Sequence, residues 1–431
     1  MDQAIGSKIA DYLIKPVHPN QILLSLKKNI HKRDIVTAET DRNYQQNFGR
    51  LSMQINDSLT ADDWIEVYRQ LVYWELELKE ADSSMHDMLK MQKAEANAAF
   101  CKFIKRNYMD WMKDRDKSPV MSPDLFKKFI FPTLDSGEKL FLIVMDNFRY
   151  DQWRILSQEL AELFTFDEQL YYSILPTATQ YSRNAIFSGL MPEQISRMFP
   201  DLWVDEDSEE GKNINESPLI KTQIERYRRK DTFSYNKVND SASAEKLLSQ
   251  FNNLLQNDLN VVVVNFIDIL SHSKTDSRMM RELANDEAND EAAYRSLILS
   301  WFRHSSVREL FRSMAATGRK VMITTDHGSI MVNHAVKIAG DRTTNTNLRY
   351  KLGKNLGFNP KDVYEINEPL KAHLPSPNVS TSYIFCTEAD YFVYQNNFNN
   401  FASFYKETFQ HGGVSLEEMI IPFITLNPKK K

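Results

Sequence analysis

The chain has 431 residues, of which 42% are hydrophobic and 11% aromatic, and this composition supports a large core and excludes wholesale disorder. It has 53 Lys and Arg against 58 Asp and Glu, and the formal net charge of -5 argues against a protein that binds nucleic acids through bulk charge. The length predicts two or three domains.

Targeting signals and cysteine chemistry are not indicated. No apolar run approaches the ~20 residues that a membrane-spanning helix needs, and the N-terminus MDQAIGSKIADYL lacks the basic and apolar regions of a signal peptide. The two cysteines, Cys101 and Cys386, lie far apart and form no C-x-x-C pattern, so neither a disulfide framework nor a thiolate zinc site is indicated. We expect a reduced, cytoplasmic protein without membrane insertion.

Residues 1–33 contain a short apolar segment, a Lys15-Pro16 pair and a helical pattern that opens after Pro19. The order A-D-Y-L-I-K-P resembles the last strand of a CheY-like receiver domain, and this resemblance implies that Lys15 pairs with the phosphorylated aspartate. That aspartate belongs to earlier receiver strands, and one strand cannot form a parallel sheet. We expect a C-terminal receiver remnant in a truncated chain, and a sensor kinase partner only for a full-length receiver.

Residues 34–131 predict a helical bundle that acts as a connector. The segment is helical in period and nearly free of Gly and Pro, and Thr60 with Asp63 forms a start like a capping box. A longer helix is expected over about 83–114. Its Met- and Trp-rich stripe suits a partner groove or a helix-on-helix core, and the core is the favoured interpretation. Three helices that bury these faces against one another predict a three-helix bundle.

Residues 132–431 alternate between strands and helices, which predicts an α/β domain with a mostly parallel sheet sandwiched by helices. The main strands are expected at residues 139–148, 169–176, 261–268, 320–326 and 418–426. Residues 383–386 and 391–394 predict an antiparallel edge hairpin, and Pro422 indicates an edge or final strand. The acidic insert 201–217 predicts a solvated loop, and the charged helical segment 275–305 predicts a lid or cap beside the site.

Several of these strands end in a carboxylate, imidazole or hydroxyl side chain, at the place where open α/β sheets bind their ligands. In chain order these side chains are Asp146, Thr177, Thr179, Asp268, Asp326 and His327, and they are joined by His272 and His411. Carboxylate oxygen and imidazole nitrogen suit Zn²⁺ or Mn²⁺ without thiolates. The set predicts a two-metal hydrolytic site.

Each residue taken alone has a structural alternative. The alternative for Asp146 is a cap of the following helix. The alternative for His272 is a surface histidine, and for His411 it is a turn residue beside Gly412 and Gly413. The ordered occurrence of all of them favours the metal site, because independent turns rarely reproduce an ordered set.

The ordered set resembles the alkaline phosphatase superfamily and, within it, the PglZ domain. The motifs are MDNFRYDQW, LPTATQYSRNAIFSG, NFIDILSH, TTDHGS and HGGVSLEEMIIP, and they span about residues 141–422. Together with the receiver remnant and the helical connector, the architecture resembles the PglZ-containing response regulators linked to type IX secretion. The resemblance implies an alkaline-phosphatase-like fold for residues 132–431. Sulfatases have a similar fold, but their C/S-x-P-x-R motif is absent here.

The resemblance also implies roles for the site residues. One zinc would be held by Asp268, His272 and His411, and the other by Asp146, Asp326 and His327, with Mn²⁺ as an alternative metal. Thr179 would be the nucleophile, with Thr177 as the fallback and Ser182 as a further neighbouring hydroxyl. Arg149, Arg183 and Asn184 are candidates for holding the phosphate oxygens, although the arginines suit salt bridges equally well.

These roles lead to two functional hypotheses. The first is a zinc-dependent phosphodiesterase that acts on a cyclic or linear oligonucleotide, such as a cyclic dinucleotide, as the output domain of a response regulator. The second is a regulatory scaffold, stabilised by zinc, that binds a sigma factor or a type IX secretion component. A homodimer is expected from response-regulator behaviour.

Overall fold

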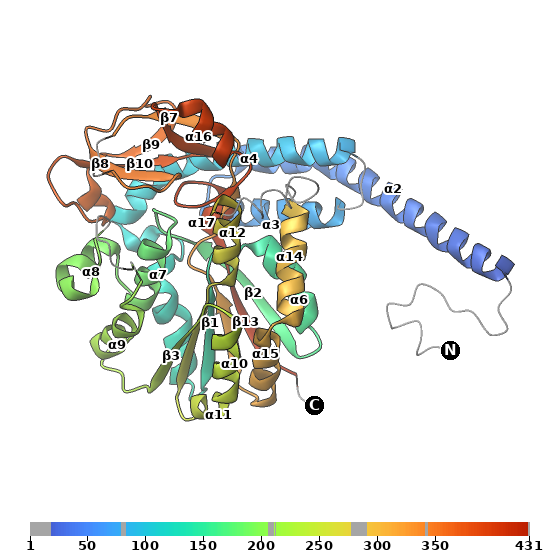
Figure 1. Cartoon of the computed structure of the whole chain (residues 1–431), viewed down its shortest axis with the longest axis horizontal. Helices are drawn as coiled ribbons and strands as arrows, with labels where there is room; N and C mark the ends of the chain where they lie inside the picture. The colour runs from blue at the N-terminus through green and yellow to red at the C-terminus, as the bar shows by residue number, and fades with distance from the viewer. Residues whose placement is uncertain are drawn as a thin grey trace. The chain divides into compact units, whose positions relative to one another are not determined.

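Figure 1 shows the computed structural model of the chain, which describes residues 19–78, 83–205, 211, 213–276, 291–340 and 344–429. The predicted receiver strand and Lys15 lie outside the described residues, as do 206–210 of the acidic insert and 277–290 of the predicted lid. The chain forms two compact units: one holds Met1–Ser58 and Arg69–Ala96, and the other holds Leu59–Tyr68 and Asn97–Lys431.

Three long helices begin the described chain: α2 (Pro19–Asp57), α3 (Ala61–Glu77) and α4 (Ser83–Lys113). The predicted start of α3 is confirmed, because the Asp63 amide donates to Thr60 Oγ1 at 3.2 Å and the Thr60 amide donates to Asp63 Oδ2 at 2.9 Å. Within the first unit the three helices meet at buried Tyr44. Its ring lies 5.3 Å from that of Trp74, and its hydroxyl donates to Gln92 at 3.1 Å.

Short helical segments connect α4 to the α/β region. They are η2 (Arg115–Lys117), η3 (Ser122–Asp124), the π-helical η4 (Phe126–Ile130) and α5 (Phe131–Asp135). Among the described helices, none combines the length and the apolar character that a membrane span requires.

The large sheet has six strands in the order β2-β13-β5-β1-β4-β3. Their bounds are β1 (Leu140–Met145), β2 (Phe164–Tyr172), β3 (Phe233–Val238), β4 (Leu259–Val264), β5 (Lys320–Thr324) and β13 (Ile420–Pro428). Strands β3, β4, β1 and β5 pair in parallel, whereas β13 is antiparallel to both of its neighbours. Every residue of β1 and β4 is buried, as expected for strands covered on both faces.

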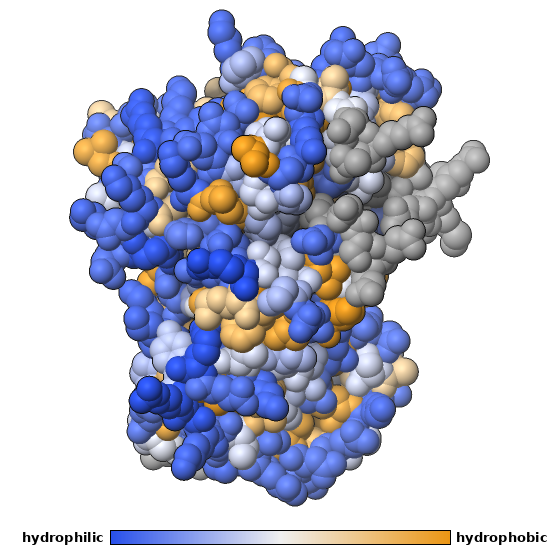
Figure 2. All heavy atoms as spheres, turned by 90° about the vertical axis from the view of Figure 1, so that its left-hand side faces the viewer, coloured by the Kyte–Doolittle hydropathy of each residue, from blue (hydrophilic) through white to orange (hydrophobic). Residues whose placement is uncertain are grey.

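Helices surround this sheet, and Figure 1 shows α7 and α9 towards its β3 end and α6 and α14 towards its β2 end. The helices are α6 (Tyr150–Leu160), α7 (Thr179–Ser188), α8 (Pro192–Met198), η5 (Pro200–Leu202), α9 (Glu216–Arg226), α10 (Ser241–Ser249), α11 (Phe251–Leu254), α12 (Phe266–Asp276), α14 (Glu291–His304) and α15 (Ser306–Ala316). The α/β fold class is confirmed. On the face drawn in Figure 2, hydrophilic side chains predominate and apolar ones appear in separate groups, which is usual for a solvated surface.

Smaller sheets follow β5 in the chain. They are built from β6 (Ile330–Met331), β7 (His334–Ile338), β8 (Tyr350–Lys354), β9 (Val363–Ile366), β10 (Thr381–Cys386), β11 (Asp390–Tyr394) and β12 (Phe409–Gln410). The described helical segments among them are η6 (Pro369–Ala372), α16 (Phe398–Tyr405) and α17 (Leu416–Met419). The three-stranded sheet has the order β8-β10-β9, while β7 pairs with β11 and β6 pairs with β12.

Two sequence-based expectations are wrong, and the expectation for Pro422 is met by one of its two alternatives. The strands at 383–386 and 391–394 do not form a hairpin, because β10 pairs with β8 and β9 while β11 pairs in parallel with β7. For Pro422, which indicated an edge or final strand, the second alternative holds: β13 is the final strand and lies between β2 and β5. Pro422 is tolerated because the β5 ladder starts at Phe423, so the missing N–H interrupts no bond to β5. Asp268 does not end a strand, since β4 stops at Val264 and Asp268 lies in the first turn of α12.

Candidate metal centre

The loops at the carboxyl edge of the large sheet bring two groups of potential ligands together. One triad is Asp268, His272 and His411, and the other is Asp146, Asp326 and His327. In each triad the ligand atoms lie within 4.8 Å of one another. The structure thus gathers the same six side chains, in the same two sets, that the sequence motifs imply.

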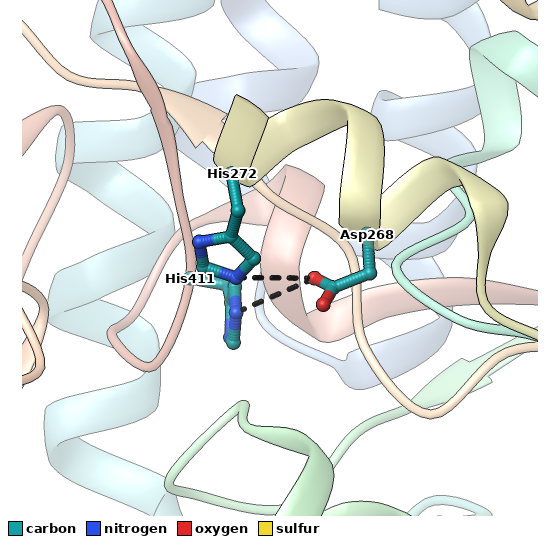
Figure 3. Close-up of side chains that lie close together, drawn as sticks. All are labelled: Asp268, His272 and His411. Atoms are coloured by element: carbon teal, nitrogen blue, oxygen red, sulfur yellow. Dashed lines mark ion pairs between the residues drawn. The ribbon is translucent and has the colours of Figure 1, made fainter. Parts of the chain in front are cut away.

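The first triad depends on helix α12. Asp268 and His272 are four residues apart, so they share one face of the helix, and Asp268 Oδ1 lies 3.5 Å from His272 Nε2. His411 Nε2 reaches the same oxygen from the loop after β12, at 3.7 Å (Figure 3). Burial raises the pKa of Asp268, but the hydrogen bond from His272 and the nearby imidazoles outweigh it and hold this pKa well below its usual range.

The second triad is fully buried at the ends of β1 and β5. His327 Nε2 lies 3.8 Å from Asp146 Oδ1 and 3.8 Å from Asp326 Oδ2. Arg183 ion-pairs with both carboxylates, at 2.5 Å and 2.9 Å. Burial raises the pKa of Asp146 well above its usual value, and the charge of Asp326 adds to that rise. For Asp326, burial also raises the pKa, but Arg183 and His327 outweigh it and lower the pKa overall.

Two of the imidazoles are oriented by backbone carbonyl groups. His327 Nδ1 lies 3.0 Å from the Gly328 carbonyl oxygen, and His411 Nδ1 lies 3.1 Å from that of Thr177. A carbonyl only accepts, so each Nδ1 carries a proton and each Nε2 faces the carboxylates, as in metal-ligating histidines. Burial lowers the pKa of His411 to about 3, so the ring is in the neutral, ligating form near neutral pH.

The two triads adjoin one another and fit divalent cations. The His327 and His411 rings stack with centroids 4.1 Å apart and an angle of 16° between their planes. Three carboxylates and three imidazoles form a donor set without thiolates, which suits Zn²⁺ or Mn²⁺. The triad carboxylates together carry more negative charge than the single positive charge of Arg183 can balance. Buried charges are paired or coordinate metals, so a bound cation would balance the remainder.

Thr179 lies within this centre, whereas Thr177 lies beside it. Thr179 begins α7, and its Oγ1 lies 3.0 Å from His327 Nε2 and 3.4 Å from Asp146 Oδ1. The Thr177 hydroxyl is fully buried, donates to the Gly413 carbonyl at 2.8 Å and accepts from the Gly412 amide at 3.0 Å. Of the two hydroxyls, that of Thr179 is the one in contact with the ligands.

The three candidate phosphate-binding residues have different surroundings. Arg149 is buried, pairs with Asp151 at 2.7 Å and lies over the Phe409 ring at 4.9 Å. Arg183 contacts the second triad and also Glu216, at 3.2 Å. Asn184 is buried on α7, and its Oδ1 has no hydrogen-bond partner within the described part of the chain. Of the two arginines, only Arg183 therefore pairs with the carboxylates of the second triad, Asp146 and Asp326.

Sequence reasoning missed Asn147. Its side-chain amide donates to Asp268 Oδ1 at 3.3 Å, and its backbone amide donates to Asp326 Oδ1 at 3.4 Å, so it connects the two triads. Its φ of 59° lies in the left-handed region, which Asn tolerates better than most residues. An Asn directly after the strand-end Asp146 was the available signal.

Two family models match parts of this chain. A family model described as the BREX system PglZ alkaline phosphatase-like domain matches residues 125–426, and one described as the PorX response regulator linker domain matches residues 34–112. Curated protein sequences give no match.

Similar solved structures include an inactive murine ectonucleotide pyrophosphatase/phosphodiesterase 5 in complex with AMP, at 12% identity and a TM-score of 0.40, covering 67% of this chain and 87% of that one. Phosphonoacetate hydrolase from Sinorhizobium meliloti 1021 in complex with phosphonoacetate is similar at 11% identity and a TM-score of 0.41, covering 67% of this chain and 90% of that one.

Proposed function

Because the chain belongs to the PglZ alkaline phosphatase-like family and carries a PorX response regulator linker domain, we propose that it is a zinc-dependent phosphodiesterase serving as a response-regulator output domain. Family membership supports phosphoester hydrolysis in general. The proposal adds zinc as the metal, phosphodiesters as the substrate class and type IX secretion as the process. It also divides the chain into a receiver remnant at 1–33, a helical connector at 34–131 and the PglZ domain at 132–431.

The observation that carries the proposal is the position of the Thr179 hydroxyl, 3.0 Å from His327 Nε2 in the second of two adjoining triads. Two divalent cations would lower the pKa of a hydroxyl and stabilise the entering and leaving oxygens of an in-line displacement. Thr179 Oγ1 attacks phosphorus, the bond from phosphorus to the leaving alcohol breaks, and the hydroxyl proton ends on that alcohol. Water then hydrolyses the phosphothreonine, which restores Thr179 and releases a phosphomonoester.

The charges around the centre favour a diester over a monoester. A monoester dianion needs additional positive contacts, but Arg183 already pairs with Asp146 and Asp326, and Arg149 pairs with Asp151. A phosphodiester carries one negative charge and needs less compensation. A cyclic or linear oligonucleotide is therefore the proposed substrate, with the positive potential confined to the site.

Hydrolysis of bis-p-nitrophenyl phosphate tests the nucleophile. We expect the zinc-loaded wild type to release p-nitrophenol and Thr179→Ala to lose nearly all of this rate, because the attacking oxygen is removed. Thr177→Ser, which keeps a hydroxyl for Gly412 and Gly413, is the matched control and should retain activity. Equal rates for the wild type and Thr179→Ala would contradict the assignment.

The match to a response-regulator linker favours a second candidate, a regulatory scaffold. In that case zinc is structural, and the chain dimerises or binds a sigma factor or a type IX secretion component. A wild-type protein that holds two zinc ions per chain but hydrolyses no diester would favour the scaffold. Light scattering with and without zinc tests dimerisation.

A further inference from the structure

His411 differs from the other ligands in how it is held. Asp146, Asp326 and His327 follow strands of the large sheet, and Asp268 and His272 share helix α12. His411 instead opens residues 411–418, which connect β12 to the last strand through two glycines and the short helix α17. All eight residues of this 411–418 segment are buried. Its position therefore depends on side chains from elsewhere in the fold.

A buried ion pair holds the segment from one side. Arg349 and Glu418 are both fully buried, and Arg349 donates to Glu418 Oε2 at 2.5 Å and to Oε1 at 3.1 Å. The same carboxylate accepts from the Gly413 amide at 2.9 Å and from the Ser415 hydroxyl at 2.6 Å. The ion pair thus ties the residue before β8 to the backbone two residues after His411.

Helix α4 holds the segment from another side. Asn97 Oδ1 accepts from the Leu416 amide at 2.8 Å, and its Nδ2 donates to Glu417 Oε2 at 3.0 Å. One turn later, the Cys101 thiol donates to the Val414 carbonyl at 3.2 Å. Both α4 residues fall within the 34–112 range that matches the response regulator linker.

The packing at Gly413 leaves no room for a side chain. A Cβ at this position would lie 2.6 Å from the Cys386 carbonyl oxygen and 2.9 Å from Arg349 Cζ. The backbone of the segment is therefore pressed directly against the guanidinium that binds Glu418.

We propose that Asn97, Arg349 and Glu418 are positioning residues that hold the 411–418 segment so that His411 Nε2 points at Asp268. They thereby set the affinity of the Asp268-His272-His411 triad for its cation. The other triad takes no ligand from this segment and should be affected much less. This inference rests on the proposed function only in requiring that the triads bind metal.

Two matched double variants test the ion pair. Arg349→Met with Glu418→Gln and Arg349→Met with Glu418→Leu remove the same two charges, so neither leaves an unpaired buried charge. Only the Gln variant keeps an acceptor for the Gly413 amide. Zinc is titrated against a chromophoric competing chelator, and unfolding is followed by circular dichroism. In the Leu variant we expect one of the two ions to bind about 10–100-fold more weakly, with a smaller loss in the Gln variant.

Asn97→Leu tests the α4 contacts independently of the ion pair. It keeps the size of the side chain and removes both hydrogen bonds, and we expect it to weaken the binding of the same single ion.

Arg229→Met is the control, because Arg229 also pairs with two carboxylates, Asp231 at 2.6 Å and Asp135 at 2.7 Å. It lies before β3, at the edge of the large sheet opposite the carboxyl edge. It should bind both ions as the wild type does.

The outcomes separate this inference from the proposed function. Folded variants that bind both ions with wild-type affinity would overturn the inference, as would equal weakening of both ions. Equal binding by the Gln and Leu double variants would overturn the role of the Gly413 contact. A wild-type chain that binds no divalent cation would overturn the metal centre itself, and the inference with it.

Discussion

Arg183 shows at the scale of one residue how the centre balances its charges. Its guanidinium lies 2.5 Å from Asp146, 2.9 Å from Asp326 and 3.2 Å from Glu216. A bound cation in the second triad would share two of these carboxylates with the arginine. The arginine should therefore matter most to stability when no metal is bound.

Replacement of Arg183 by Met tests this interpretation. Removing one partner of a buried ion pair leaves uncompensated charge and costs about 3–5 kcal/mol of the free energy of unfolding. We expect a loss of this size in chelator-treated protein and a smaller loss with zinc, measured by urea unfolding. Arg154→Met is the control, because Arg154 is about half exposed and its ion pair with Glu168 is worth at most ~1 kcal/mol. Equal losses with and without zinc would contradict the shared-charge argument.

The grouping of the six triad side chains was predictable from the sequence, whereas the residues that support them were not. Asp146, Asp326 and His327 stand at the ends of apolar runs. Such strand ends can be recognised in a sequence, because a buried strand is a continuous run of hydrophobic residues. The contacts of Arg183 with Asp146 and Asp326 are long-range, so spacing left its salt-bridge role open. Asn147 follows the strand-end Asp146, which was a signal for its place, but its contact with Asp268 spans 121 residues and could not be read from local spacing.

At the scale of elements, prediction succeeded where the chain is apolar and failed where partners must be chosen. The strands β1, β4 and β5 were located, but β3, with its polar sequence FSYNKV, was missed. The short runs that became β10 and β11 are buried and apolar, and such runs fit more than one neighbour. Pairing is decided by tertiary packing, so their assignment to separate sheets could not be read from the sequence.

Helix α14 gives an element-scale prediction, because it supports α12. The Tyr294 hydroxyl donates to the Ile267 carbonyl at 3.0 Å, next to Asp268, and its ring stacks on Phe409 with centroids 4.4 Å apart. Tyr294→Phe keeps the ring and removes only this hydrogen bond, because the Ile267 carbonyl lies within α12. We expect the free energy of unfolding to fall by about 0.5–1.5 kcal/mol, as measured by denaturant unfolding. Tyr73→Phe, at an exposed ring on α3, is the control and should leave the free energy of unfolding unchanged. A comparable loss in this control would contradict the role of the Tyr294 hydrogen bond.

At the scale of the whole molecule, the two triads connect distant parts of the second unit. The six side chains of the triads come from the ends of β1 and β5, from α12 and from the 411–418 segment, whereas the first unit contributes none within the described residues. Bound ions would therefore cross-link the second unit alone. A ligand at a hundred times its dissociation constant stabilises its fold by about 2.7 kcal/mol.

Chelation should consequently destabilise one unit selectively. Hydrogen exchange measured by mass spectrometry should show faster exchange in β1, β5 and α12 when zinc is removed, and unchanged exchange in α2. Asp326→Ala lacks a ligand of the second triad, so chelation should change its exchange less than that of the wild type. If α2 responded as strongly as β1, the two units would unfold together, and the separation of metal-dependent from metal-independent stability would be wrong. If neither responded, the ions would not cross-link the fold, and the triads would be sites that bind metal without supporting the structure around them.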